Sequence, residues 1–230
     1  MGAVFYFIAK STKETPAPEA TETAPDIILA DRPIATLIPT ADGHYLAMSI
    51  TKLDKITAKT LDYELLYSLP DGRTQGVPGS ITLSGNTPIE RKLLLGSESS
   101  GKFRYDEGVE QGTLTLKFRD ANGKLAAKFM SLWHLQGSVS EVSSTDGSFR
   151  LTFKKAPAKT FFVTMNTFGI AVDVPAELTA GPWGVFSSSK SALTGTVQMS
   201  SVSTIYRLSG GKWVQIKTTT PDLGIFIGTK

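Results

Sequence analysis

The feature that most constrains the fold is an Asn122-Gly123 pair between two runs of alternating apolar residues. Asn-Gly suits the type I′ turn of a two-residue hairpin, because both residues tolerate positive φ. Such a turn sets Leu116 opposite Phe129, and the apolar residues of both runs then lie on one face of the hairpin. We therefore predict a β-hairpin within residues 93–136 that buries this face.

The same register predicts which side chains form the core and which face water. Lys117 falls opposite Lys128, a like-charge pair that is tolerable only in solvent. Residues on the other face alternate with this pair and are apolar. The expected core residues are Leu116, Phe118, Phe129 and Trp133.

From Asp26 onward the chain reads as short strands separated by turn signals, which predicts an all-β fold. Turn residues recur at 70–73, at Asp146-Gly147 and at Gly210-Gly211. The one candidate helix, residues 49–67, has a weak apolar period and several β-branched residues, so a strand is the better interpretation. Antiparallel β-sandwiches fit this pattern.

We expect two tandem immunoglobulin-like sandwich domains, over residues 26–136 and 137–230. The segment before Gln136 completes a hairpin, and a new series of turn signals begins after it. Each part has about the size of one immunoglobulin-like domain, roughly 100 residues. The alternative is a single continuous two-sheet domain, since all-β folds can exceed 200 residues.

The amino terminus reads as a membrane anchor followed by a tether. Residues 1–9 are almost entirely apolar, and residues 10–25 form a Pro/Thr/Glu-rich stretch with nothing to bury, which predicts a disordered linker. Nine helical residues span only about 13 Å of a hydrocarbon core roughly 30 Å thick, so we expect residues 1–9 to be the outer end of a longer transmembrane helix. The other interpretation, a buried first strand, fits poorly because the linker separates it from everything else.

Composition excludes several classes of function. Lys and Arg total 24 against 21 Asp and Glu, spread along the chain, which does not predict a nucleic-acid partner. Cysteine is absent, so disulfides, thiol catalysis and cysteine-bound metal are excluded. His44 and His134 follow no metal-ligand spacing, and the serines lack a Gly-x-Ser-x-Gly context. We expect no catalytic centre, no cofactor and no metal.

The segment from Gly96 to Gly112 is the most unusual stretch, because charges and aromatic rings alternate in it. We predict either a solvated crossover between sheets or a recognition loop. A weak Ca²⁺ site needs six to eight oxygens, and this spacing matches no known calcium loop. Paired carboxylates for glycoside hydrolysis would have to face each other across a cleft. The candidate ligand or partner residues are Glu98, Lys102, Arg104, Tyr105, Asp106, Glu107 and Glu110.

Two stretches carry a resemblance to known proteins. The run Ser99-Ser-Gly-Lys-Phe-Arg-Tyr-Asp-Glu-Gly-Val109 resembles a segment of uncharacterised membrane-anchored extracytoplasmic β-sandwich proteins of the bacterial envelope. The run Ile205-Tyr-Arg-Leu208, with Gly-Gly-Lys-Trp213, is similar to closing strands of bacterial surface sandwiches. The resemblance implies a location in the cell membrane, with one amino-terminal anchor and the β domains outside.

The function expected from these features is a non-catalytic binding, adhesion or structural module of the cell envelope, with carbohydrate or another envelope protein as partner. The alternative is a hydrolase of envelope polysaccharide or peptide with its site on the 96–112 loop. Exposed aromatic rings would favour carbohydrate, because sugars stack on them. The rings to compare are Tyr45, Tyr63, Tyr67, Tyr105 and Trp183.

Overall fold

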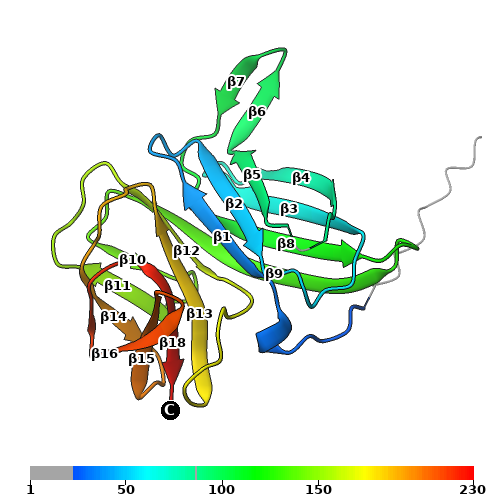
Figure 1. Cartoon of the computed structure of the whole chain (residues 1–230). Coiled ribbons are helices and arrows are strands. Elements are labelled where there is room, and N and C mark those ends of the chain that lie inside the picture. Colours follow the sequence, from blue (N-terminus) through cyan, green and yellow to red (C-terminus); the bar gives the residue numbers. More distant parts are fainter. Residues whose placement is uncertain (1–22, 86) are drawn as a thin grey trace, which may run out of the picture.

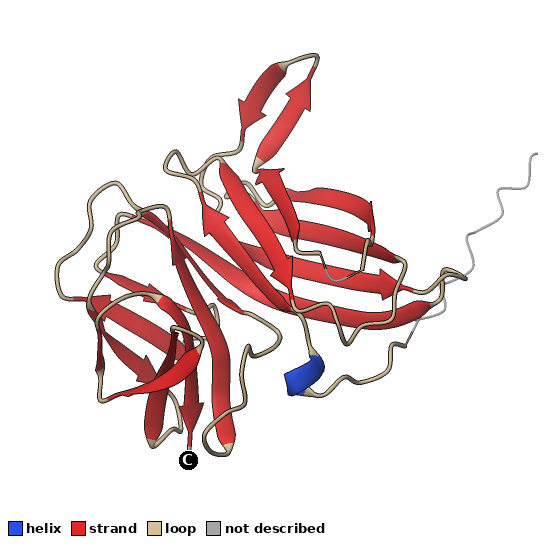
Figure 2. Ribbon diagram, in the orientation of Figure 1, coloured by secondary structure: helices blue, strands red, loops and turns tan. Residues whose placement is uncertain are grey.

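The computed structural model describes residues 23–85 and 87–230, and these residues form an all-β protein of antiparallel sheets. Figure 2 shows that strands make up nearly all of the regular structure, with one short 3₁₀ turn, η1 (Leu29–Asp31). The expected anchor at residues 1–9 and most of the expected linker at 10–25 lie outside the described residues. The stretch 49–67 contains strands, as predicted.

The described residues form eighteen strands, which fall into four sheets (Figure 1). Their bounds are β1 (Ile34–Pro39), β2 (Tyr45–Thr51), β3 (Thr60–Ser68), β4 (Thr74–Thr82), β5 (Ile89–Leu94), β6 (Gly96–Ser99), β7 (Lys102–Tyr105), β8 (Gln111–Arg119), β9 (Leu125–Gly137), β10 (Glu141–Ser143), β11 (Phe149–Phe153), β12 (Phe161–Asn166), β13 (Leu178–Ser187), β14 (Gly195–Met199), β15 (Thr204–Ser209), β16 (Lys212–Ile216), β17 (Thr219–Thr220) and β18 (Gly224–Thr229).

One long sheet is the frame of the molecule. It has nine strands in the order β16-β15-β18-β13-β12-β9-β8-β3-β4. A three-stranded sheet, β1-β2-β5, packs on the part of the long sheet that ends at β4. A four-stranded sheet, β10-β11-β14-β17, packs on the part that ends at β16. The fourth sheet is the β6–β7 hairpin, which projects away from the rest in Figure 1.

The two smaller sheets cover opposite faces of the long sheet, and this makes two separate cores. Strand β12 shows the arrangement, because Val163 and Met165 belong to one core while Phe162, on the other face, belongs to the second. Side chains of an antiparallel strand alternate between faces, so a strand buried on both sides must be apolar throughout. All three of these side chains are fully buried.

The first core lies between β1-β2-β5 and the β4-β3-β8-β9-β12 part of the long sheet. Each large apolar side chain fully buried there stabilises the fold by about 1.5–3 kcal/mol relative to exposure. The predicted hairpin supplies its centre, and all four of its expected core residues are buried. The first core contains Leu37, Leu46, Met48, Ile50, Leu61, Leu65, Leu114, Leu116, Phe118, Phe129, Trp133, Val163 and Met165 among others.

The second core lies between the four-stranded sheet and the β12-β13-β18-β15-β16 part of the long sheet. Its aromatic rings contact one another, with Phe149 5.6 Å from Phe226 and Phe153 4.7 Å from Phe162 between centroids. The second core contains Val142, Phe149, Leu151, Phe153, Phe162, Val185, Val197, Ile205, Ile216 and Phe226.

The predicted register of the β8–β9 hairpin is confirmed away from its turn. Leu116 pairs with Phe129, and Lys117 with Lys128. The pair of lysines lies on the face opposite the first core, as expected from alternation. A one-residue irregularity follows Phe118 on the way to the turn.

The predicted type I′ turn is wrong, and a side chain explains why. Only Gly123 of the Asn122-Gly123 pair has positive φ, at 78°. The carboxylate of Asp120 accepts hydrogen bonds from the N–H groups of Asn122, at 2.8 Å, and Lys124, at 3.0 Å. This Asx-type bonding stabilises a three-residue loop with its last residue left-handed, and the nearby bulge restores the register.

The expected domain boundary at 136–138 coincides with the end of β9. The ladder of the long sheet continues directly across it, with Gly137 paired to Phe161 and Trp133 paired to Met165. The two parts of the chain thus share one sheet. Their division into two immunoglobulin-like domains stays a prediction.

Candidate functional site

The stretch predicted as a loop from Gly96 to Gly112 is partly a regular hairpin. Strands β6 and β7 pair from Gly96–Tyr105 to Ser99–Lys102. The two residues between them, Ser100 and Gly101, both have positive φ, as a type I′ turn requires. The Ser100-Gly101 pair between two short polar runs is the local signal for this turn, and the prediction of a loop did not include it.

The hairpin has an aromatic face and a basic face. Phe103 and Tyr105 alternate with Lys102 and Arg104, so the rings and the cations point to opposite sides. Glu98 pairs with Phe103 across the strands and therefore shares the aromatic face. Its carboxylate also accepts a hydrogen bond of 2.9 Å from the N–H of Gly101.

Three rings form a stack that runs from the body of the protein onto the hairpin. The His44 and Tyr105 rings lie 3.8 Å apart between centroids and are parallel within 5°. Phe103 continues the series, 6.2 Å from Tyr105 and parallel within 9°. We call Phe103, Tyr105 and His44 the ring stack. Its outer end is open, because Phe103 is 52% exposed.

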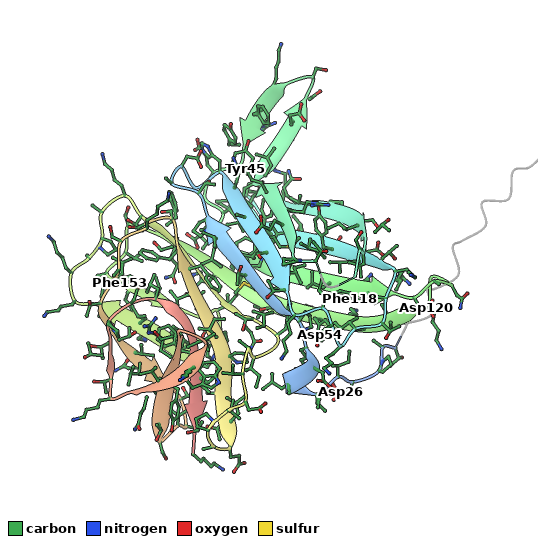
Figure 3. The ribbon with its side chains drawn as sticks, in the orientation of Figure 1. Asp26, Tyr45, Asp54, Phe118, Asp120 and Phe153 are labelled. Atoms are coloured by element: carbon green, nitrogen blue, oxygen red, sulfur yellow. The ribbon has the colours of Figure 1, made fainter. Side chains whose placement is uncertain are left out.

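Residues at the base hold the ring stack in place. Tyr45, labelled in Figure 3 at the foot of the hairpin, contacts Tyr105 edge to face at 6.2 Å. Lys92 Nζ lies 3.8 Å from the centroid of the Tyr45 ring, a cation–π contact. A hydrogen bond with the Tyr45 side chain raises the pKa of Tyr105 above its usual value. The phenol is therefore neutral at ordinary pH.

Asp42 fixes the turn that carries His44. Its carboxylate accepts hydrogen bonds from the Thr40 hydroxyl and from the backbone N–H of His44, and these bonds lower the pKa of Asp42. The second carboxylate oxygen lies 3.7 Å from His44 Nδ1. Asp42 is therefore a fixed negative charge beside the ring stack.

The remaining candidate residues lie at the hairpin base. Arg104, Asp106 and Glu107 border a shallow hollow of about 300 Å³ together with the ion pair of Asp71 and Arg73. Asp106 accepts a 2.9 Å hydrogen bond from the buried phenol of Tyr67. Burial raises the pKa of Tyr67, and this hydrogen bond raises it further.

Glu110 is exposed on the approach to β8, outside the hairpin. Its backbone C=O accepts a 2.6 Å hydrogen bond from the N–H of Leu135. The structure therefore brings most of the candidate residues to one hairpin, and separates Glu110, Lys102 and Arg104 from its aromatic face.

The five rings chosen for comparison divide into two kinds. Tyr45 and Tyr105 meet at the ring stack. Tyr67 is buried, Tyr63 packs against the first core, and Trp183 packs against the second. His44 was the residue that sequence reasoning did not connect with this site, because nothing in its neighbourhood indicates a partner so far along the chain.

The described residues contain no group of three or more His, Cys, Asp or Glu side chains that could hold a metal ion. Near the hairpin, backbone and side-chain hydrogen bonds from Arg73 lower the pKa of Asp71, as those from Thr40 and His44 do for Asp42. A general acid requires a raised pKa instead, so these two carboxyls suit fixed charges.

No family model, curated protein or solved structure matches this chain. Within residues 23–85 and 87–230, no helix is long and apolar enough to cross a membrane.

Proposed function

We propose that this protein is a non-catalytic binding module of a bacterial cell envelope, and that its β6–β7 hairpin binds carbohydrate. The observation that carries the proposal is the open end of the ring stack, where Phe103 presents an exposed face on a projecting hairpin. A pyranose ring has a face of C–H groups, which pack well on the electron-rich face of an aromatic ring.

Polar groups beside Phe103 suit the hydroxyls of a sugar. Glu98 lies directly across the strand pair from Phe103 and accepts hydrogen bonds. Asp42 adds a second negative charge near the other end of the ring stack. We expect a neutral or amino sugar rather than an anionic one, because these carboxylates would repel a uronic acid.

Preorganisation favours binding at this site. Tyr105 is held between His44 and Phe103, and its contacts with Tyr45 orient it further. Rings that are fixed before binding lose little conformational entropy when a ligand stacks on them. A membrane anchor at residues 1–9 and a tether at 10–25 complete the proposal, and these rest on the sequence alone.

The test is a titration of the purified protein with oligosaccharides of glucose, N-acetylglucosamine and mannose, followed by NMR and calorimetry. We expect one of these probes to perturb the Phe103 and Tyr105 signals. Phe103→Ala should then weaken its binding by about tenfold, the equivalent of roughly 1.4 kcal/mol. Lys102→Ala is the matched control, because it changes the neighbouring residue on the opposite face of the hairpin.

Equal loss of binding in both variants would contradict a site on the aromatic face. Binding of an envelope protein instead of a sugar, still dependent on Phe103, would keep the site and replace the ligand class. Turnover of a glycan, abolished by Glu98→Gln or Glu107→Gln, would replace the binding function by the hydrolase alternative.

A further inference from the structure

A second surface lies far from the ring stack, on the side of the β4-β3-β8-β9 strands that faces away from the first core. We call it the outer face. Alternation places Leu66, Thr113 and Leu132 in one row across it, and Pro78, Glu64, Thr115 and Met130 in the next. Met130 is 65% and Leu132 is 51% exposed, so two large apolar side chains lie uncovered side by side.

The four-stranded sheet borders the outer face along one side, and we call it the wall. Along the other side the outer face ends at the free edge of the long sheet. The four-stranded sheet stands on this side of the long sheet, because His134 Nδ1 donates a 2.8 Å hydrogen bond to Ser143 C=O of β10. Thr145, in the turn between β10 and β11, lines a hollow of about 280 Å³ together with Leu66 and Leu132. At the opposite side, β4 is the last strand of the long sheet.

Charges on the outer face are segregated by strand. Asp62 and Glu64 lie on β3, whereas Lys117 and Lys128 lie opposite each other on β8 and β9. Within the described residues neither lysine forms an ion pair, while Asp62 binds Arg119 at 3.0 Å. Asp62 lies opposite Lys117 in the β3–β8 pair, but its carboxylate binds Arg119. Like charges directly opposite each other destabilise a strand pair, so a further carboxylate above Lys117 and Lys128 would reduce their repulsion.

We propose that two copies of this chain associate through their outer faces about a two-fold axis. This axis is parallel to the strands and lies above the outer face, over the line between β3 and β8. A two-fold interface must be self-complementary, because the same patch contributes both sides. With this axis, β3 of one copy lies over β8 of the other, so that Asp62 approaches Lys117. Strand β9 lies over β4, so that Met130 meets Pro78, and Leu132 meets the Leu66 side chain where it lies beside Gly76.

The height of the four-stranded sheet above the outer face fits this arrangement. The wall is one sheet high, about 10 Å, which is also the spacing of two sheets packed face to face. Each wall would therefore stand beside the β4 edge of the other copy and cover its unpaired backbone groups. An exposed edge strand is a hazard that proteins commonly cover in some such way.

The area is sufficient for a reversible dimer. Strands about 4.8 Å apart with a rise of about 3.4 Å per residue give the four-strand patch roughly 600 Å² on each copy. The total of about 1,200 Å² lies at the lower end of stable interfaces. We therefore expect a concentration-dependent equilibrium between monomer and dimer.

Sedimentation velocity of the full chain over a range of concentrations, about 1–200 µM, tests this inference. We expect the weight-average sedimentation coefficient to rise with concentration toward that of a dimer. The double change Met130→Glu with Leu132→Glu should weaken association by at least about tenfold without unfolding, since both side chains are exposed. Val214→Glu is the control, because Val214 is a similarly exposed apolar residue on β16.

A chain that stays monomeric over this range would overturn the proposal, as would an equal loss of association in the Val214→Glu control. The axis has its own test, which uses the absence of native cysteine. Pro78→Cys combined with Met130→Cys should form a covalent dimer on oxidation, and each single change should not. A covalent dimer that forms from either single variant to the same extent would contradict this axis.

Discussion

At the scale of single residues, Trp133 shows how much one side chain contributes to the first core. It is completely buried, next to Tyr67 at 6.5 Å and beside the backbone of Gly112. Among residues 23–85 and 87–230, its indole N–H has no hydrogen-bond partner, so its contribution to stability comes from packing. Trp133 therefore fills space in the first core, and removing its ring should leave a cavity.

Trp133→Ala should lower the free energy of unfolding by about 3–5 kcal/mol, because the ring is fully buried. Denaturant unfolding followed by circular dichroism measures this value. Val214→Ala removes a half-exposed side chain and should change the stability by less than about 0.5 kcal/mol. A similar small effect for Trp133→Ala would mean that the first core does not depend on this ring.

At the scale of elements, the β6–β7 hairpin depends on one glycine at its base. Gly96 has φ +147°, and a Cβ atom there would lie 2.2 Å from the backbone oxygen of Arg104. Strain of this kind costs about 1–3 kcal/mol, which the hairpin can relieve only by shifting relative to the body of the protein. Such a shift would separate Tyr105 from His44.

Gly96→Ala should therefore disrupt the ring stack while the cores remain intact. The measurement is the NMR shift of the His44 ring protons, which stacking on Tyr105 displaces upfield. We expect most of this displacement to disappear in Gly96→Ala and to persist in Ser97→Ala, a change at the next residue of the same strand. Unaltered His44 signals in Gly96→Ala would show that the base of the hairpin tolerates a side chain.

At the scale of the whole molecule, β12 couples the two cores. Its side chains enter the first core from one face and the second core from the other. A strand that is shared in this way cannot leave one core without exposing the other. We therefore expect the chain to unfold as one cooperative unit rather than as two independent domains.

Calorimetry should show a single transition whose calorimetric and van't Hoff enthalpies agree. Met165→Ala, in the first core, and Phe162→Ala, in the second, should each lower the free energy of unfolding by about 2–5 kcal/mol. Each should therefore move the whole transition to lower temperature. Two transitions, of which each variant moves only one, would instead support two independently folding sandwiches.

Local patterns determined much of the first half of the fold. The alternation from Leu114 to Phe118 has the period of a strand, so the buried face of the hairpin followed from the sequence. The all-β class followed in the same way from repeated short strands and turns. The turn itself did not, because the Asp120 carboxylate bonds two N–H groups and favours a loop that the Asn-Gly pair alone does not indicate.

The site depended on both levels. Parity along β7 already places Phe103 and Tyr105 on one side of a strand, and this much is local. Only the tertiary structure brings His44 against Tyr105, and only it lays the two small sheets on opposite faces of one long sheet. These arrangements arise from contacts between segments far apart in the chain, and backbone hydrogen bonding between strands carries no residue code that would reveal them in advance.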